Sequence, residues 1–262
     1  MSRRPGDGMD KQKKRDSAGR EVALVTGSTS GIGAAIARRL VAEGMFVILH
    51  SRGSADEGAA LAAELGHAAY IQADLAQEPE RIRLVAKAVA LTGRLDVLVN
   101  NAGISAVIAH EDLTAASAQI WRALHEVNVI APFQLIALSE GHLRDSARRN
   151  GRACVINISS HAGVRPKGAS IPYAATKAAL NHVTRLLAQT LAPQIRVNAI
   201  APGLVDTPMT ADWSEAQALW RDRAPMKRAA TPKDIAQAVM ALLASDYITG
   251  EVLLADGGLN LT

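Results

Sequence analysis

The stretch Val25-Thr26-Gly27-Ser28-Thr29-Ser30-Gly31-Ile32-Gly33 decides the fold, because an apolar strand pattern changes to a helix pattern within it. Its three glycines suit a tight turn, close approach of a phosphate to the backbone, and close packing of a helix on a strand. The first turn of the following helix would offer free N–H groups and a positive dipole to a pyrophosphate. The G-x-x-x-G-x-G spacing differs from the commoner G-x-G-x-x-G, and any tight turn can use glycine, so the stretch alone predicts only a candidate phosphate site.

Outward from that stretch, short β-branched runs alternate with longer amphipathic, alanine-rich segments. Continuous apolar strands that alternate with helices indicate a parallel sheet covered on both faces. Seven such strands without a Pro/Gly-rich linker predict one α/β domain over residues 21–262, built on a doubly wound parallel sheet. The expected strands are Val22–Thr26, Phe46–His50, Ala69–Gln72, Asp96–Asn100, Cys154–Ser159, Ile195–Ile200 and Glu251–Ala255, and the expected helices lie near 32–43, 54–65, 78–92, 114–147, 172–191 and 232–244.

Residues 204–230 interrupt the alternation and are expected to leave the sheet. The segment carries large apolar side chains at Met209, Trp213, Trp220 and Met226, which fit either ordinary packing or an apolar lid over a substrate. Ligands bind at the carboxyl ends of strands in open α/β sheets, and this segment follows such an end. We therefore favour a substrate-lid insertion.

Composition excludes several classes of protein. With 48% apolar and 21% charged residues, the 262-residue chain is neither disordered nor collagen-like, and its single cysteine excludes a disulfide scaffold. No run approaches the roughly 18 uncharged apolar residues of a membrane span. No apolar run of the secretory type follows the basic N-terminal stretch, so we expect a cytoplasmic protein without membrane contact.

The net charge of +4 belongs to the N-terminal segment. Residues 1–20 hold seven Lys and Arg against three Asp, whereas the rest of the chain holds 22 basic and 22 acidic residues. We expect residues 1–20 to be a disordered basic arm, either a solvated tail or a contact for a polyanion. Because the domain itself is charge-balanced and the chain has eight aromatic residues in all, no nucleic-acid partner is expected.

The end of the second strand bears on cofactor choice. An acidic residue there would accept a hydrogen bond from a ribose 2′-OH, whereas a basic residue accommodates a 2′-phosphate. The strand runs into His50-Ser51-Arg52, with no carboxylate before Asp56. Ser51 can hydrogen-bond a phosphate oxygen and Arg52 can add a charge-assisted contact, so NADP(H) is favoured over NAD(H). The alternative is that Arg52 is an ordinary surface arginine.

Two further stretches place polar groups at strand ends. Asn100-Asn101-Ala102-Gly103 closes the fourth strand, where Asn101 can bond backbone and Gly103 permits close approach of a ribose, although the same four residues also make a good turn. Ser160 follows the fifth strand, and Tyr173 and Lys177 stand at i and i+4, on one face of a helix.

The Tyr–Lys pair suits acid–base chemistry. A lysine ammonium beside a tyrosine favours the phenolate and is expected to lower the tyrosine pKa from about 10. Such a phenol can donate a proton to a carbonyl oxygen as hydride arrives, or remove one from an alcohol, and Ser160 could hydrogen-bond the same oxygen. Tyr-x-x-x-Lys alone is a weak signal, because such pairs arise by chance.

Other reactive residue types carry less weight. His110 and His125 precede glutamates but lack the second histidine of H-E-x-x-H, so no metal site is expected. Cys154 lies in an apolar run and is expected to be a buried small hydrophobe. His161 follows Ser160, but without a G-x-S-x-G elbow it does not indicate a hydrolase, and we expect it to line the substrate cleft or face solvent.

The motifs taken together resemble the short-chain dehydrogenase/reductase family. The residues that carry the resemblance are Thr26-Gly27-x-x-x-Gly31-Ile32-Gly33, Asn100-Asn101-Ala102-Gly103, Ser160, Tyr173-x-x-x-Lys177 and Pro202-Gly203, and it extends from about Glu21 through Ile248-Thr249-Gly250 and Asp256-Gly257-Gly258. Within the family the chain is most similar to 3-oxoacyl-[acyl-carrier-protein] reductases and related alcohol and sugar dehydrogenases. The resemblance implies a Rossmann-type single domain and a homotetramer.

The resemblance also implies roles for residues. The catalytic tetrad would be Asn128, Ser160, Tyr173 and Lys177, with Asn128 holding a water that relays protons to the lysine. The implied cofactor contacts beyond those already named are Ser30 (where many NADP(H)-dependent relatives have Lys or Arg), Ile32, Asp74 and Leu75 at the adenine, Ala102, and Pro202, Gly203, Val205 and Thr207 at the nicotinamide.

We therefore expect an NADP(H)-dependent oxidoreductase that transfers hydride between nicotinamide and a small-molecule carbonyl or secondary alcohol, with a 3-oxoacyl thioester as one candidate substrate. The alternatives are an NAD(H)-dependent alcohol, sugar or steroid-type dehydrogenase of the same family, and a non-catalytic protein that senses NADP(H).

Overall fold

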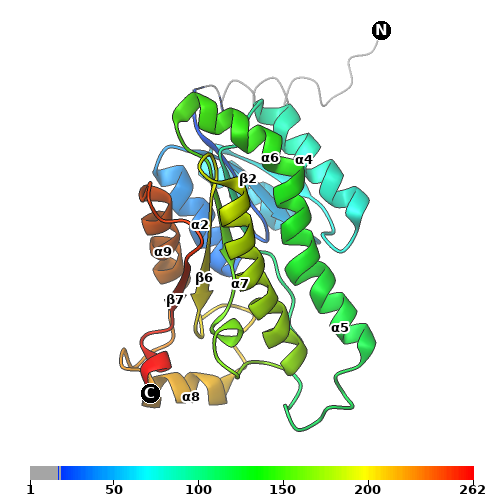
Figure 1. Ribbon diagram of the computed structural model, residues 1–262, viewed down its shortest axis with the longest axis vertical. Helices are drawn as coiled ribbons and strands as arrows, with labels where there is room; N and C mark the ends of the chain where they lie inside the picture. The colour runs from blue at the N-terminus through cyan, green and yellow to red at the C-terminus, as the bar shows by residue number, and fades with distance from the viewer. Residues whose placement is uncertain (1–16, 18) are drawn as a thin grey trace.

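The β-strands form one parallel sheet. The computed structural model describes Ser17 and residues 19–262, so the expected arm at residues 1–20 lies almost entirely outside the described residues. Within the described part the sheet has seven strands in the order β3-β2-β1-β4-β5-β6-β7, and every neighbouring pair is parallel. The predicted doubly wound α/β fold is confirmed (Figure 1).

The elements alternate along the chain as the sequence predicts. The strands are β1 (Val22–Val25), β2 (Phe46–Ser51), β3 (Ala68–Gln72), β4 (Val97–Asn100), β5 (Cys154–Ile158), β6 (Arg196–Pro202) and β7 (Val252–Ala255). The α-helices are α2 (Gly31–Ala42), α3 (Ala55–Leu65), α4 (Glu78–Thr92), α5 (Ala118–His125), α6 (Ala131–Asn150), α7 (Ile171–Leu191), α8 (Ser214–Arg223) and α9 (Pro232–Ala244). Short turns of other helix types are η1 (Glu126–Ile130), η2 (His161–Gly163) and η3 (Leu259–Leu261).

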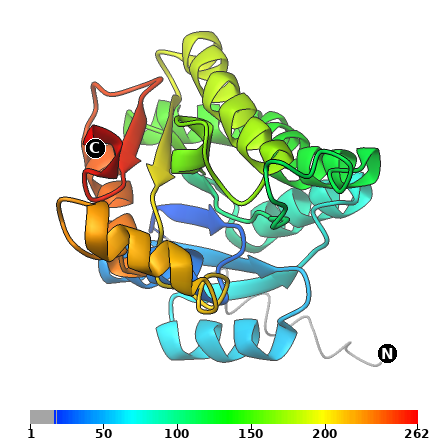
Figure 2. The same ribbon diagram turned by 90° about the horizontal axis from the view of Figure 1, so that it is seen from below.

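Two apolar cores lie on the two faces of the sheet. Successive side chains of a strand point to opposite faces, so β1 contributes Val22 and Leu24 to one core and Ala23 and Val25 to the other. The first core is closed by α4, α6 and α7, and the second by α2, α3 and α9 (Figure 2). Burial on both faces explains why the strands are continuous apolar runs rather than alternating ones.

The strand order reverses between β1 and β4. The chain builds β1, β2 and β3 outward in one direction and then returns to pair β4 with β1 on the other side, in a register that sets Ala23 opposite Val97. The loops that leave these two strands diverge to opposite sides of the sheet. A crevice opens at such a point, at the carboxyl ends of the strands.

The prediction of one continuous helix near 114–147 is wrong in two respects: the helix begins later, and it is interrupted. Asp112 accepts hydrogen bonds from Thr114 and from the Ala115 amide, which forms a turn, and the helix begins only at Ala118, capped by Ser117. It is then interrupted by the π-helical turn η1. Pro132 explains the interruption, because it has no N–H to donate to the carbonyl of Asn128 four residues earlier.

Residues 204–230 leave the sheet, as expected, but contain the helix α8. The two ends of the segment are joined by a parallel bridge between Val205 and Ala230. The amide of Ala230 donates to the carbonyl of Leu204, and the amide of Asp206 donates to the carbonyl of Ala230. The segment is therefore a closed excursion whose base is fixed to the domain.

Asp96 joins three elements at the opposite end of the sheet from the crevice. Its buried carboxylate accepts from the amide of Val22 at 2.7 Å, from both sides of the Arg94 guanidinium at 2.5 and 2.8 Å, and from Asn150 at 3.0 Å. Ser146 donates to the same carboxylate. Removing the Asp96 carboxylate would leave these buried donors without an acceptor.

Asp96→Ala should lower the free energy of unfolding by about 3 kcal/mol, because it breaks a buried, charge-assisted network. Urea denaturation of the wild type and the variant measures the change. Asp145→Ala is the matched control, since its pair with Arg148 is exposed and should contribute less than about 1 kcal/mol. Equal effects of the two substitutions would contradict this account.

Candidate active site

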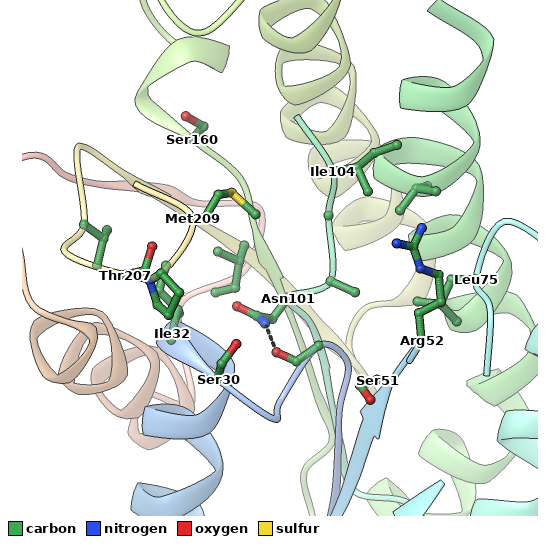
Figure 3. A pocket seen from close by; sticks show the side chains of 18 of the residues that line it. Ser30, Ile32, Ser51, Arg52, Leu75, Asn101, Ile104, Ser160, Thr207 and Met209 are labelled. Carbon is green, nitrogen blue, oxygen red and sulfur yellow. Dashed lines mark hydrogen bonds between the residues drawn. The ribbon is translucent and has the colours of Figure 1, made fainter. Parts of the chain in front are cut away.

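A cleft of about 590 Å³ lies at the carboxyl ends of the strands (Figure 3). It is lined by residues that follow β1, β2, β3, β4, β5 and β6, together with part of α7. The cleft brings together most residues expected from the sequence, namely Gly27, Ser30, Gly31, Ile32, Ser51, Arg52, Asp74, Leu75, Asn101, Ala102, Gly103, Ser160, Tyr173, Lys177, Pro202, Gly203, Val205 and Thr207. Gly33 and Asn128 do not line it and act from behind its wall.

Glycine is required in the turn after β1 by close packing. A Cβ on Gly27, whose φ is +62°, would lie 2.9 Å from the Cα of Ala102. A Cβ on Gly33 would lie 2.2 Å from the carbonyl oxygen of Gly27, and one on Gly31 would lie 3.3 Å from Thr207. Gly33 therefore lets α2 pack against the turn, and Gly27 and Gly31 keep the turn close to neighbouring loops.

The first turn of α2 presents unused donors to the cleft. Ser30 is the N-cap residue, but its side chain makes no capping hydrogen bond. The N–H groups of Gly31, Ile32 and Gly33 cannot find acceptors inside the helix, and the first two of these residues line the cleft. Together with the space that the missing side chains leave, these donors fit the pyrophosphate of a dinucleotide.

The loops after β1 and β4 are held together by a reciprocal set of hydrogen bonds. The side-chain amide of Asn101 donates to the carbonyls of Thr26 and Gly27 at 2.9 and 2.8 Å. The hydroxyl of Thr26 accepts from the amides of Asn101 and Ala102, both at 3.0 Å. Asn101 therefore bonds to backbone, as expected, and fixes the floor of the cleft.

His50 is a cleft residue whose role the sequence analysis missed. Its Nδ1 accepts from the amide of Gly27 at 3.1 Å, and its Nε2 lies 3.0 Å from the carbonyl of Ala73, which requires a neutral ring with the proton on Nε2. Burial lowers the pKa of His50 from 6.5 to about 4. The signal that could have found it is a polar residue at the end of an otherwise apolar strand.

Ser51 and Arg52, at the end of β2, both line the cleft. The Arg52 guanidinium is exposed at the cleft and makes no ion pair with any described residue. A second hollow of about 430 Å³ adjoins it, lined in part by Arg83 and Lys87. Arg83 is already bound to Glu80 and to the carbonyl of Gln72, so Arg52 and Lys87 are the cations left for an anion.

Tyr173 and Lys177 share the cleft-facing side of α7. Ser170 caps the helix by accepting from the amide of Tyr173 at 3.3 Å, which sets where the helix begins. The Lys177 ammonium donates to the carbonyl of Ile158 at 3.0 Å and lies 5.8 Å from the centre of the Tyr173 ring. Burial lowers the pKa of Lys177 from 10.5 to about 8.

The direction expected for the Tyr173 pKa is not the one found. Burial raises the pKa of Tyr173, and its hydrogen bond with Ser160 opposes this only in part. The Lys177 ammonium donates to backbone and lies 5.8 Å from the centre of the ring, and its charge does not offset the effect of burial. The Ser160 hydroxyl also accepts from the amide of Ala162 at 3.2 Å. The phenol is therefore protonated at neutral pH, which suits a proton donor.

Asn128 lies in the π-helical turn η1 and is buried. Its side chain accepts from the amide of Ile104 at 2.9 Å and donates to the carbonyl of the same residue at 2.9 Å and to Thr176 at 3.2 Å. These bonds occupy the side-chain amide. The expected water relay at Asn128 would have to use its backbone carbonyl, to which Pro132 cannot donate.

The segment 204–230 contributes unevenly to the cleft. Thr207, Pro208 and Met209 line it, and Met209 is 60% exposed. Trp220 instead packs inward: a Cβ on Gly203 would lie 2.9 Å from its ring, and the ring is edge-to-face with His161 at 6.0 Å. The first part of the segment is thus placed to cover a substrate, while Trp220 anchors α8. That residues 204–230 form a lid over the substrate stays a prediction.

His161 does not line the cleft or face solvent, which corrects the expectation for it. It is buried, and its Nε2 lies 3.6 Å from a carboxylate oxygen of Asp256. Cys154 is buried as expected, and burial raises the pKa of its thiol to about 11. No cluster of potential metal ligands occurs among the described residues. None of the described helices is long and apolar enough to cross a membrane.

Comparisons with known proteins give matches over nearly the whole chain. A family profile described as Enoyl-(Acyl carrier protein) reductase matches residues 27–260. Ketoacyl reductase 2 of the granaticin polyketide synthase from Streptomyces violaceoruber is 46% identical over 243 residues, covering 92% of this chain and 96% of that protein.

Solved structures give the same result. The 3-ketoacyl-(acyl-carrier-protein) reductase from Brucella melitensis, complexed with NADH, is 32% identical with a TM-score of 0.83, covering 91% of this chain and 98% of that one. The actinorhodin polyketide ketoreductase with NADPH is 33% identical with a TM-score of 0.82, covering 93% and 98%. The two structures hold different nicotinamide cofactors.

The buried His50 ring should make stability depend on pH. Its pKa is near 6.5 in the unfolded chain and near 4 in the folded one, so the unfolded state binds more protons between these values. The free energy of unfolding should therefore fall as pH drops from about 6.5 to about 4, by roughly 3 kcal/mol from this group.

His50→Gln removes this titration, so the stability difference between wild type and variant should shrink over the same pH range. Urea denaturation at a series of pH values measures it. His182→Gln, at an exposed position of α7, is the matched control. A wild-type-to-variant difference that does not change with pH would show that His50 is not the buried neutral group described here.

Proposed function

Because the chain belongs to the short-chain dehydrogenase/reductase family, we propose that it is an NADP(H)-dependent oxidoreductase that interconverts a carbonyl group and a secondary alcohol. The observation that carries the proposal is the meeting of Ser160, Tyr173 and Lys177 in the same cleft as the glycine turn after β1. One cleft therefore holds both a proton donor and a set of backbone donors suited to a dinucleotide.

The residues of the chain have separate roles in the proposed reaction. The nicotinamide, when bound, supplies or accepts the hydride. Tyr173 donates its phenolic proton to the carbonyl oxygen in the reductive direction and accepts it back in the oxidative direction. Ser160, which is hydrogen-bonded to Tyr173, positions and polarises the carbonyl oxygen of the substrate.

Lys177 stabilises the phenolate that forms when the proton leaves Tyr173, and it holds the ribose next to the nicotinamide. Gly103 leaves space for that ribose, since a Cβ there would lie 3.5 Å from the lysine ammonium and 3.2 Å from the Asn128 side chain. Asn128 keeps this loop in place through its bonds to Ile104.

NADP(H) is the preferred cofactor in this proposal. Arg52 supplies a free guanidinium at the cleft, and no carboxylate follows β2 to accept from a ribose 2′-OH. NAD(H) dependence is the second candidate, supported by the relative whose structure contains NADH and by Ser30, which replaces the basic residue expected before Gly31 in many NADP(H)-dependent relatives.

A 3-oxoacyl thioester is the first substrate to test. The relatives named for ketoacyl reduction support this class, and the exposed Met209 offers an apolar contact at the cleft. We further propose a cytoplasmic homotetramer. Ile130, the last residue of η1, and Phe133, in the first turn of α6, are exposed and provide an apolar face for a partner subunit, which sedimentation velocity would test.

Tyr173→Phe should reduce kcat with NADPH and a 3-oxoacyl thioester by about 10²- to 10⁴-fold, because it removes the proton donor. Cofactor binding, followed by quenching of protein fluorescence, should persist. The control is Tyr247→Phe, which removes a hydroxyl from a fully exposed ring. Near-normal turnover by Tyr173→Phe would contradict the mechanism, and binding of NADPH without turnover of any carbonyl by the wild type would favour a sensor.

Arg52→Asp should shift the cofactor preference toward NADH, because it replaces the cation that faces the 2′-phosphate with a group that can accept from a 2′-OH. The ratio of kcat/KM for NADPH to that for NADH should fall at least about tenfold, the scale of one lost charge-assisted hydrogen bond. A wild type that already prefers NADH would refute the NADP(H) assignment.

A further inference from the structure

Tyr70 lies behind the wall of the cofactor cleft, on the strand next to β2. It belongs to β3, where it pairs in register with Leu49, and it is not one of the residues that line the cleft. Its phenolic oxygen is 2.7 Å from the hydroxyl oxygen of Ser51. Ser51 itself lines the cleft (Figure 3). Among the described residues, Ser51 is the one hydrogen-bond partner of the Tyr70 hydroxyl.

The Ser51 hydroxyl takes part in two hydrogen bonds within the protein. The amide of Ser54 donates to its oxygen at 3.1 Å, and Tyr70 bonds to the same oxygen. A serine hydroxyl has one proton to donate and two lone pairs to accept with. The direction of the bond with Tyr70 therefore decides what Ser51 can offer to a ligand.

Either hydroxyl can be the donor in this geometry, and counting donors and acceptors within the protein favours Tyr70. If Ser51 donated to Tyr70, the phenolic proton would have no acceptor among the described residues, and Ser51 could present only a lone pair to the cleft. If Tyr70 donates to Ser51, the two lone pairs of the Ser51 oxygen accept from the Tyr70 hydroxyl and from the Ser54 amide. Both of those groups then have an acceptor for their proton, and only the Ser51 proton lacks one. The Ser51 proton is then left to point into the cleft.

Gly58 shows that the position of Tyr70 is built into the fold. It lies inside α3, where glycine weakens a helix by about 1 kcal/mol relative to alanine. A Cβ at Gly58 would lie 2.3 Å from two carbons of the Tyr70 ring. The missing side chain lets the ring pass between α3 and the sheet and brings its hydroxyl to Ser51.

We propose that Tyr70 is a positioning residue that determines cofactor specificity: by donating to Ser51, it directs the Ser51 proton toward the 2′-phosphate of NADP(H). A phosphate dianion only accepts hydrogen bonds, so it is matched by a serine that can only donate and by the guanidinium of Arg52. This inference rests on the NADP(H) preference proposed above and adds a residue that does not itself touch the cofactor.

Isothermal titration calorimetry tests the proposal without turnover. The probes are adenosine 2′,5′-bisphosphate and adenosine 5′-monophosphate, which differ only in the 2′-phosphate. The measured quantity is the ratio of their dissociation constants, for the wild type, Tyr70→Phe, Ser51→Ala and the double variant. Phenylalanine retains the ring beside Gly58, so thermal unfolding should remain close to that of the wild type.

Tyr70→Phe should reduce the preference for the bisphosphate about three- to tenfold, the scale of one hydrogen bond to a charged group. Ser51→Ala should reduce it at least as much, and adding Tyr70→Phe to Ser51→Ala should cause no further loss, because the tyrosine acts through the serine. Tyr247→Phe, the exposed hydroxyl control, should leave the ratio unchanged.

Gly58→Ala provides an independent variant. The added Cβ displaces the Tyr70 ring, so the preference for the bisphosphate should fall although the phenol and Ser51 are both retained. A normal preference in both Gly58→Ala and Tyr70→Phe would overturn the proposal, as would additive losses in the Ser51→Ala, Tyr70→Phe pair.

The failure of this inference and that of the proposed function are distinguishable. If the wild type prefers the bisphosphate and Arg52→Asp abolishes that preference while Tyr70→Phe does not, only the role of Tyr70 is refuted. If the wild type binds the two nucleotides equally, the NADP(H) assignment fails, and the role of Tyr70 fails with it.

Discussion

The close approach of two loops at the ends of β1 and β4 is the constraint on which the rest of the site depends. A side chain on Gly27 would collide with the backbone of Ala102, and four hydrogen bonds join Thr26 and Gly27 to Asn101 and Ala102 across the same gap. Because the strand order reverses between these strands, their loops diverge beyond this contact and open the cleft. The geometry of the contact therefore fixes both the floor of the cleft and the direction in which the first turn of α2 presents its donors.

In and behind the wall of the cleft, most polar side chains are hydrogen-bonded within the protein. Asn128 bonds to Ile104 and Thr176, His50 joins the glycine turn to the end of β3, and Lys177 bonds to the carbonyl of Ile158. Groups held in this way lose little further freedom when a ligand binds, which preorganises the site. The groups left to act on ligands are few: the amides at the start of α2, the cations of Arg52 and Lys87, and the hydroxyls of Ser51, Ser160 and Tyr173.

Burial, more than charge pairing, sets the titration of the site. It lowers the pKa values of His50 and Lys177 and raises that of Tyr173, in each case by disfavouring the charged form. The sequence spacing of Tyr173 and Lys177 predicts their common helix face but not this outcome. The lysine donates to the carbonyl of Ile158 and lies 5.8 Å from the centre of the ring, and its charge does not offset the effect of burial on the phenol. Distances of a few ångströms decide such effects, and spacing along a helix does not specify them.

The sequence by itself determined the parallel sheet, the bounds of α4 and α9, and the set of strand ends that meet at the cleft, because periodic apolar patterns and glycine-rich turns are local signals. It did not reveal the π-helical turn at Asn128, although Pro132 was a local cue, and it misplaced His161, which is buried against Asp256 and Trp220. Only the tertiary structure decided which polar groups meet. His50 reaches Gly27, and Tyr70 reaches Ser51, across gaps of 23 and 19 residues in the chain. The physical reason is that a hydrogen bond between neighbouring strands depends on sheet register and on the space left by residues such as Gly58, and neither is encoded in the residues near the bond.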